Sequence, residues 1–246
     1  MLDQGHDQAA GLRRLLGEQR LNLMAFPVDE DSDEAWIAQL ARALRGLGAR
    51  PVVMDASRGR VLRAFGLRAR YELLDLLQGQ RRFDAVAEST HDGIYVMRAE
   101  QGLEAFVASG VPSQQLFAGF ARLSHGFDSL LLAMPPHELA CLASPAQAVP
   151  VIAMDSTDAG LTRAYGTVKQ LASRYGYQRF AAVVRERVGG ATAQGAHARL
   201  ATVARSFLDA EVRLAGALPA SGPRGAGLAE LAQRLLDTAA TPLTLH

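Results

Sequence analysis

Short apolar runs alternate with longer segments of helical period between Leu21 and Leu218. The runs are apolar or β-branched throughout, which is typical of strands that are buried on both faces. Strands that alternate with helices in this way form a doubly wound, mostly parallel sheet flanked by helices. The pattern therefore predicts an α/β fold with strands at Leu21–Phe26, Pro51–Met54, Ala85–Glu88, Gly93–Met97, Phe127–Ala133, Val149–Met154, Arg179–Val184 and Val212–Gly216.

Apolar residues spaced three and four apart mark the helices between these runs. They predict helices at Asp33–Leu47, Tyr71–Gln78, Gln114–Ser124, Thr157–Tyr175, Thr192–Ala210 and Leu228–Asp237. Trp36 lies on the apolar stripe of the first helix, so we expect it in the core. Ala217–Gly227 reads as a surface connection to a short final helix. That helix has a leucine stripe but a single basic residue, Arg234, which favours docking on the domain over membrane anchoring.

The residues ahead of the first strand form an amphipathic segment of their own. Asp7 can cap a helix there, and Arg13 and Arg14 project from its polar side. The apolar stripe consists of Ala9, Leu12, Leu15 and Leu16. Gly11 weakens such a helix by about 1 kcal/mol relative to alanine. Because an isolated helix this short is marginal in water, we expect it to pack on its own domain or to fold in a partner's groove.

Length and composition limit the classes of function. The 246 residues, 49% of them hydrophobic, can bury one sizeable core, and the formal charge of +1 provides no diffuse field for nucleic acid. A single cysteine, Cys141, excludes an internal disulfide and a multi-thiolate zinc site. No apolar run approaches the ~20 residues of a membrane span, and the first residues lack the order of a signal peptide. We therefore expect a cytoplasmic protein with no integral membrane segment and no direct contact with nucleic acid.

The turn after the first predicted strand lies where α/β folds bind phosphates, because a helix N-terminus offers free N–H groups there. This turn holds no glycine and no lysine, and Lys169 is the single lysine among 26 basic residues of the chain. Its acidic residues are Asp29, Glu30, Asp31, Asp33 and Glu34. Carboxylates repel a phosphate by roughly 4 kcal/mol per pair at ~4 Å and the effective dielectric of a protein surface. Because Asp31 or Asp33 can accept the bonds that a phosphate would accept, we expect the chain to fill this site with its own side chains.

Other candidate sites have weaker support. The spacing of the acids in the turn fails as a calcium loop, because its sixth position is Glu34 and its twelfth is Leu40. His137 and Cys141 share a helical face but lack an evident third ligand, so we expect a surface histidine, a buried thiol and no metal site. His91 reads as part of a turn. The chain contains no Gly-x-Ser-x-Gly elbow, so nothing supports acyl transfer.

The N-terminal segment followed by an α/β domain resembles the FlhG (FleN) family, MinD/ParA-like regulators of flagellar number and placement. The residues that carry the resemblance are Asp7, Gln8, Ala9, Gly11, Leu12 and Arg13. Weaker similarities continue through Val52–Ala56 and Leu161–Tyr165. The resemblance implies that the N-terminal helix stimulates the flagellar GTPase FlhF. It implies that Gln8 helps to orient the attacking water and that Arg13 or Arg14 contacts the partner.

The departures from that family fall on its nucleotide chemistry. Val28 and Asp33 stand roughly where its glycine-rich loop has lysines, and Glu34 stands at its magnesium-binding hydroxyl. The other substituted positions are Ser57, which follows Asp55 and replaces the water-activating acid, Ala133, which replaces a strand-terminal acid, and Arg185, which replaces the adenine-contacting asparagine. Phosphoryl transfer depends on positioning and charge stabilisation, and these positions no longer supply it.

We therefore expect a pseudo-ATPase without catalytic residues, metal or nucleotide, divided into a partner-binding helix at residues 1–19 and a MinD/ParA-like domain at residues 20–246. Two alternatives stay open: an ATPase switch that uses ATP and Mg²⁺ on a divergent site, and an adaptor for flagellar switch proteins or a flagellar transcription factor. A homodimer is compatible with all three. Recruitment to the cell pole or the membrane would then depend on partners.

Overall fold

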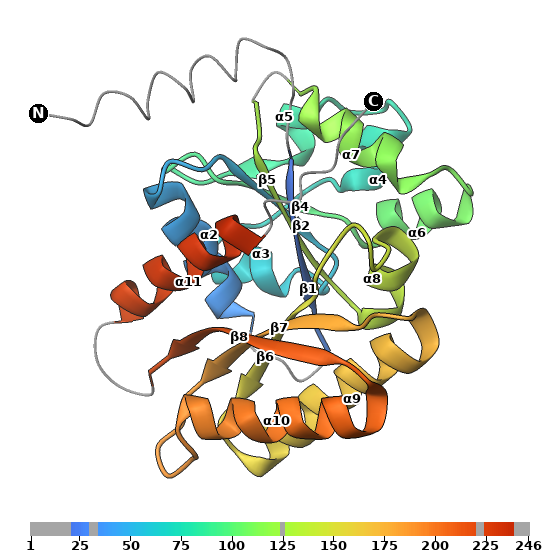
Figure 1. Ribbon diagram of the computed structural model, residues 1–246. Coiled ribbons are helices and arrows are strands. Elements are labelled where there is room, and N and C mark those ends of the chain that lie inside the picture. The colour runs from blue at the N-terminus through green and yellow to red at the C-terminus, as the bar shows by residue number, and fades with distance from the viewer. Residues whose placement is uncertain (1–20, 30–33, 124–125, 220–223, 239–246) are drawn as a thin grey trace, which may run out of the picture.

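A mostly parallel sheet runs through the molecule (Figure 1). The computed structural model describes residues 21–29, 34–123, 126–219 and 224–238. Five strands pair in the order β1-β5-β2-β4-β3 and three more in the order β6-β7-β8. A parallel bridge between Ala25 and Pro150 joins the two groups, and among the described strands only β3 runs antiparallel to its neighbour. The strands are β1 (Asn22–Pro27), β2 (Pro51–Asp55), β3 (Glu88–Ser89), β4 (Tyr95–Arg98), β5 (Ser129–Met134), β6 (Val151–Asp155), β7 (Arg179–Arg185) and β8 (Glu211–Leu218).

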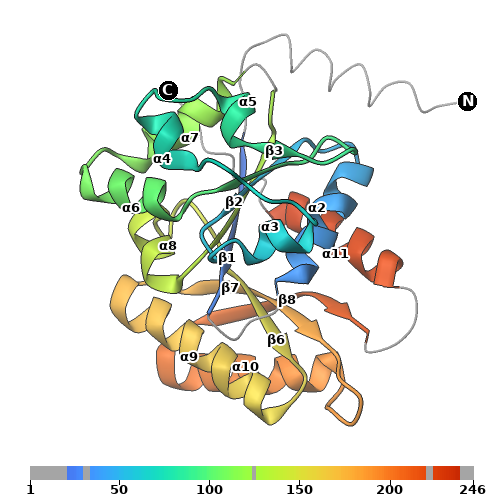
Figure 2. The same cartoon turned by 180° about the vertical axis from the view of Figure 1, so that it is seen from behind.

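Helices cover both faces of this sheet, as expected for a doubly wound fold (Figures 1 and 2). The helices are α2 (Ala35–Gly46), α3 (Arg60–Ala64), α4 (Leu73–Leu77), α5 (Phe83–Val86), α6 (Glu100–Ala108), α7 (Ser113–Ala121), α8 (Pro136–Leu142), α9 (Asp158–Tyr175), α10 (Ala193–Leu208) and α11 (Arg224–Thr238). Helices α2, α3 and α11 share one core with alternate strand residues such as Met24, Val53 and Leu131. The intervening strand residues face α4 to α8 on one half of the sheet and α9 and α10 on the other.

Seven of the expected strands are confirmed within a few residues, and one is wrong. Ala85–Glu88 is mostly the helical turn α5, and only the two-residue strand β3 follows it. Phe83 and Val86 are three residues apart and are both buried, so a helical turn places both side chains in the core. The segment Phe83–Val86 is too short to show a helical period in the sequence.

The longer expected helices are confirmed, and their caps explain where they begin. Thr157 and Thr192 each accept a hydrogen bond from the backbone N–H three residues later. The helix expected at Tyr71–Gln78 is shorter, because Glu72 forms a capping box with Asp75 and α4 begins after it. The sequence pattern did not predict α3, α6 or α8.

Helix α11 docks on the domain, as expected. Leu228, Leu231 and Leu235 are buried against β8 and α2, and the helix is longer than predicted because it begins at Arg224. The figures show α11 beside α2 on one face, away from α9 and α10 (Figures 1 and 2). An added Cβ at Gly216 would lie 3.1 Å from Cδ1 of Leu231, so the helix lies directly on the strand. In the part of the chain that is described, no helix is long and apolar enough to span a membrane.

This packing predicts the cost of removing one leucine. Leu231→Ala should lower the free energy of unfolding by about 2–5 kcal/mol, because Leu231 is fully buried and its removal leaves a cavity over β8. Urea unfolding followed by circular dichroism measures the change. The exposed Gln233→Ala on the same helix should change it by less than about 0.5 kcal/mol. Equal changes would show that α11 is not docked in solution.

Candidate functional site

The carboxyl ends of β1 and β6 meet where the chain switches from one half of the sheet to the other. In open α/β sheets, ligands bind in the crevice at such a switch point. The described residues at this crevice line a cavity of about 40 Å³, whereas small-molecule pockets enclose ~300–1,000 Å³. Charged residues from four parts of the chain line the cavity: Asp29, Glu34, Asp155, Arg163 and Arg185. This edge of the sheet is therefore the candidate functional site.

Asp155, at the end of β6, is the centre of the first charged cluster. Its Oδ1 lies 3.0 Å from Nε of Arg185 and 3.1 Å from Nε of Arg187, and its Oδ2 lies 3.7 Å from Nη2 of Arg163. Asp155 and Arg185 each expose 13% of their side chains. The guanidinium of Arg185, at the position where the resemblance places an adenine-contacting asparagine, is therefore held against a carboxylate.

Close packing fixes this carboxylate beside the start of α9. An added Cβ at Gly160 would lie 2.3 Å from the carbonyl oxygen of Asp155, so only glycine allows the first turn of the helix to approach the strand this closely. Thr157 caps the same turn by accepting a hydrogen bond of 3.1 Å from the backbone N–H of Gly160. The negative charge of Asp155 thus lies beside a helix N-terminus, where the dipole favours it.

Glu34 carries a second carboxylate into the crevice. Helix α2 begins at Ala35 instead of Asp33, with Glu34 as the N-cap residue, and the Glu34 side chain makes no capping bond. Only 2% of this side chain is exposed, and its Oε1 lies 3.4 Å from Nη2 of Arg60. The carboxylate therefore pairs with a cation across the loop. Asp31 and Asp33, the residues expected to take the place of a phosphate, lie outside the described residues, so their role stays a prediction.

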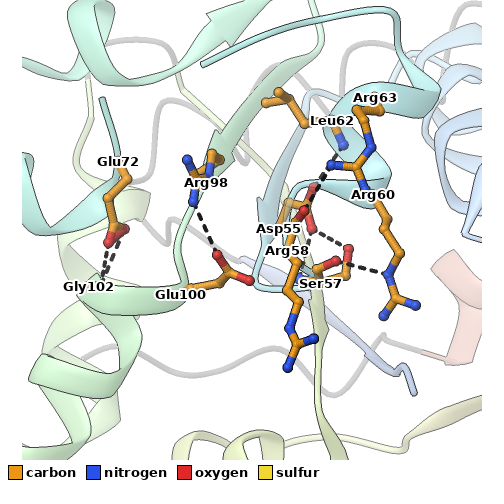
Figure 3. A network of polar contacts seen from close by, with 10 residues as sticks. All are labelled: Asp55, Ser57, Arg58, Arg60, Leu62, Arg63, Glu72, Arg98, Glu100 and Gly102. Carbon is orange, nitrogen blue, oxygen red and sulfur yellow. Dashed lines mark hydrogen bonds and ion pairs between the residues drawn. The ribbon is translucent and has the colours of Figure 1, made fainter. Parts of the chain in front are cut away.

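Asp55, at the end of β2, organises the next loop (Figure 3). This fully buried carboxylate accepts hydrogen bonds from the backbone N–H of Ser57 at 2.9 Å, the Ser57 hydroxyl at 2.5 Å and the backbone N–H of Leu62 at 2.8 Å. Nε of Arg60 donates to the carbonyl of Ser57 at 2.9 Å, which links this loop to Glu34. Ser57 is therefore buried, and its hydroxyl and backbone N–H both donate to Asp55.

The two apolar positions of the expected site are part of the main core. Val28 and Ala133 are buried in the cluster formed by α2, α3 and α11. The backbone N–H of Val28 donates to Met134, and the carbonyl of Ala133 accepts from Ala56. Asp29, which follows Val28, is half-buried at the cavity wall.

The structure brings some expected site residues together and adds others. Glu34, Asp29, Val28 and Arg185 line one cavity, whereas Asp55, Ser57 and Ala133 are not among its lining residues. The sequence interpretation included Arg185 but missed Asp155, Arg163 and Arg187. The position of Asp155 directly after a buried strand was the available signal, because side chains at strand ends line the switch point. The partner-binding residues, Asp7, Gln8, Ala9, Gly11, Leu12, Arg13 and Arg14, lie outside the described part of the chain.

The possible zinc site has a different geometry from the one expected. His137 and Cys141 both lie on helix α8, and Cys141 is exposed, so the expected buried thiol is wrong. Cys141 lies near the end of a seven-residue helix, on the side turned away from Leu139 and Leu142, which are buried. Within the described ranges, no group of three or more histidine, cysteine, aspartate or glutamate side chains is placed to hold a metal ion.

The cluster at Asp155 predicts a measurable contribution to stability. Asp155→Asn removes the carboxylate that pairs with Arg185 at a mostly buried position, which should lower the free energy of unfolding by about 1–3 kcal/mol. This expected loss in free energy of unfolding is smaller than the loss for a fully buried ion pair, because Arg163 and Arg187 are each 47% exposed. Glu230→Gln, which breaks the exposed pair with Arg234, should cost less than about 0.5 kcal/mol in the same denaturation experiment. A loss at Asp155 no larger than that control would contradict the arrangement.

Comparisons with known proteins identify the fold. No protein-family model matches the chain, and no curated protein matches it in sequence. The MinD cell division protein in the MinC:MinD complex of Aquifex aeolicus is 15% identical, with a TM-score of 0.64 over 88% of this chain and 96% of that one. The cell division ATPase MinD of Pyrococcus furiosus is 15% identical, with a TM-score of 0.61 over 89% and 99%. McdA of Cyanothece in complex with ATP is 14% identical, with a TM-score of 0.57 over 91% and 96%. The chain therefore has the MinD/ParA-like P-loop NTPase fold, as its α/β pattern and its resemblance led us to expect.

Proposed function

We propose that this chain is a nucleotide-free pseudo-ATPase of the FlhG/FleN type. It regulates flagellar number and placement by presenting the segment from Asp7 to Arg14 to the GTPase FlhF. Two independent features support the proposal: the MinD-like fold and the Asp-Gln-Ala-x-Gly-Leu-Arg sequence immediately ahead of its first strand. The protein acts in the cytoplasm and reaches the cell pole through its partners, which include flagellar switch proteins or a transcription factor.

The observation that carries the proposal is the charge at the switch-point crevice. A triphosphate site needs cations and free N–H groups that face the phosphates. Here the cations Arg60 and Arg185 already contact the carboxylates of Glu34 and Asp155, and Asp29 adds a third acid at the cavity wall. The McdA structure that holds ATP has the same fold.

The size of this repulsion decides the expected affinity. One unit charge held ~4 Å from another of the same sign costs about 4 kcal/mol at the effective dielectric of a protein surface. Each 1.4 kcal/mol changes a dissociation constant by about tenfold, and the ion pairs with the arginines offset part of this repulsion. The remaining cost is that a phosphate could recruit Arg60 or Arg185 only by breaking its ion pair with Glu34 or Asp155.

In the proposed complex the N-terminal segment enters the GTPase. Asp7 fixes the start of the helix, and Gln8 orients the attacking water, which is a role that glutamine takes in other GTPases. Arg13 or Arg14 contacts partner acids or nucleotide phosphates. These roles follow from the resemblance and need no nucleotide on this chain.

The segment is tested by one substitution in the full chain. Gln8→Ala should reduce the stimulated GTPase rate of FlhF by about tenfold or more, because the water loses its orienting amide. Released phosphate measures the rate. Gln19→Ala, a glutamine of the same N-terminal region outside the motif, should leave it unchanged. Undiminished stimulation by Gln8→Ala would refute the assigned role, and the adaptor hypothesis would then be preferred if flagellar proteins still bind.

The crevice is tested by titration with ATP and Mg²⁺. We expect binding weaker than about 1 mM by isothermal titration calorimetry, because the acids of the crevice repel the phosphates. McdA, whose structure holds ATP, serves as the positive control. A dissociation constant clearly below that value would contradict the pseudo-ATPase assignment and favour a nucleotide-driven switch.

A further inference from the structure

A second and larger depression lies at the opposite edge of the sheet. It encloses about 530 Å³, within the ~300–1,000 Å³ range of ligand pockets. It is formed by the first residues of β1, β7 and β8, the loop before β6 and the last turns of α11. We call it the amino-edge groove, because the amino ends of these strands form it. It is separate from the switch-point cavity, which lies at the carboxyl ends.

The groove has apolar walls, of which Leu23, Phe180 and Leu235 are buried, while Leu214 and Pro145 are half-buried and Ala146 is exposed. Pro145 and Ala146 belong to the loop before β6, whereas Leu214 lies within a strand. Removing apolar surface from water contributes about 25 cal/mol per Å², so an amphipathic segment gains by covering these side chains.

One buried polar group at the groove, the side-chain nitrogen of Gln147, also lacks a hydrogen-bond acceptor among the described residues. Nε2 of Gln147 is buried but donates to no acceptor in the described ranges, whereas its Oε1 accepts from the backbone N–H of Ser144 at 2.8 Å. An unsatisfied buried donor costs about 1–3 kcal/mol. The last carbonyl groups of a helix are acceptors without internal partners, so the end of a docked helix would supply what Gln147 lacks.

The charges at the groove are of both signs. Arg179, Arg213 and Arg234 line it together with Glu211 and Asp237. Glu211 is already engaged, since its hydrogen bond with Arg213 lowers the pKa of its carboxyl group and the charge of Arg179 lowers it further. Asp237 has no oppositely charged partner within ion-pair distance among the described residues, so a fitting occupant presents an apolar stripe and a base for Asp237.

The segment directly ahead of β1 has this composition. Its stripe is Ala9, Leu12, Leu15 and Leu16, and Arg13 and Arg14 supply the bases. The chain enters β1 beside the groove, because Leu23 and Met24 form part of its wall. A helix over residues 7–16 would be about 15 Å long, and residues 17–20 can extend about 13 Å, so the reach is sufficient.

We propose that residues 7–16 dock in the amino-edge groove through their leucine stripe. The docked segment buries Leu12, Leu15 and Leu16, places its last carbonyls near Gln147 and sets Arg13 or Arg14 beside Asp237. On the proposed function, docking withholds Gln8 from the GTPase, so the groove and the GTPase compete for one helix. The domain then controls the segment without any nucleotide.

Disulfide trapping in the full chain tests the docking. Leu12→Cys is combined with Ala146→Cys at the groove, in a Cys141→Ser background that removes the native thiol. The matched control pairs Leu12→Cys with Ala198→Cys, another exposed alanine, on α10 across the sheet from α11 (Figure 1). Under a mild oxidant we expect the groove pair to form its intramolecular disulfide at least about tenfold faster, because docking raises the local concentration of the two thiols. Equal rates would overturn the proposal.

A second change separates docking from chance encounter. Adding Leu15→Asp and Leu16→Asp to the groove pair should reduce its rate to that of the control, because charged side chains cannot cover the apolar wall. Both changes lie outside the core clusters of the described residues, so loss of folding does not account for the result. A rate that stays high would show that the leucine stripe is not the docking surface, and the proposal would fail.

The GTPase assay distinguishes this proposal from the function on which its consequence rests. Leu214→Gln in the full chain should raise the stimulation of FlhF about twofold or more at subsaturating concentration, because the fraction of available helix rises. Rapid trapping with no stimulation of FlhF by any variant would retain docking and refute the proposed function. Stimulation without preferential trapping would retain the function and refute docking.

Discussion

The carboxyl edge of a parallel sheet favours negative charge. In this chain the side chains that supply this charge also connect distant elements of the fold. Helix N-termini converge there, and their free N–H groups and dipoles favour an anion. In this chain Asp55 and Asp155, at the ends of β2 and β6, and Glu34, at the start of α2, bring carboxylates to that edge. Arginines pair with two of these acids: Arg60 with Glu34, and Arg163, Arg185 and Arg187 with Asp155. These ion pairs connect elements that are distant in sequence.

The fold was predictable because its signals are local. Strands such as β5, whose residues are all buried, appear in the sequence as short apolar runs, and Thr157 and Thr192 mark helix starts by hydrogen bonds that reach only three residues. The failures are elements too short to show a period. Phe83 and Val86 are buried by one turn of helix, and α3 is held by the carboxylate of Asp55, which accepts from the N–H of Leu62. Such a turn is stabilised by its surroundings, which the sequence pattern does not contain.

The candidate site was predictable only in part, for a related reason. The acids near the first turn and the strand-end residue Arg185 could be placed from their order along the chain. The pairing of Asp155 with Arg185 and Arg187 could not, because it depends on the register that sets Asp155 opposite Arg185 across β6 and β7. Cys141 shows the same limit, since one side of a short helix was taken for the other. Strand register decides the first and the packing of α8 on the domain decides the second, and residue types encode neither.

Arginine rather than lysine suits this arrangement. A guanidinium presents several donors in a planar fork, so Arg185 and Arg187 can both hold Asp155. These ion pairs fix the charged side chains at the carboxyl edge of the sheet. Strand β1 begins beside the amino-edge groove and ends beside the switch-point cavity. The proposed docking of the N-terminal segment would therefore act at the amino edge, away from these ion pairs.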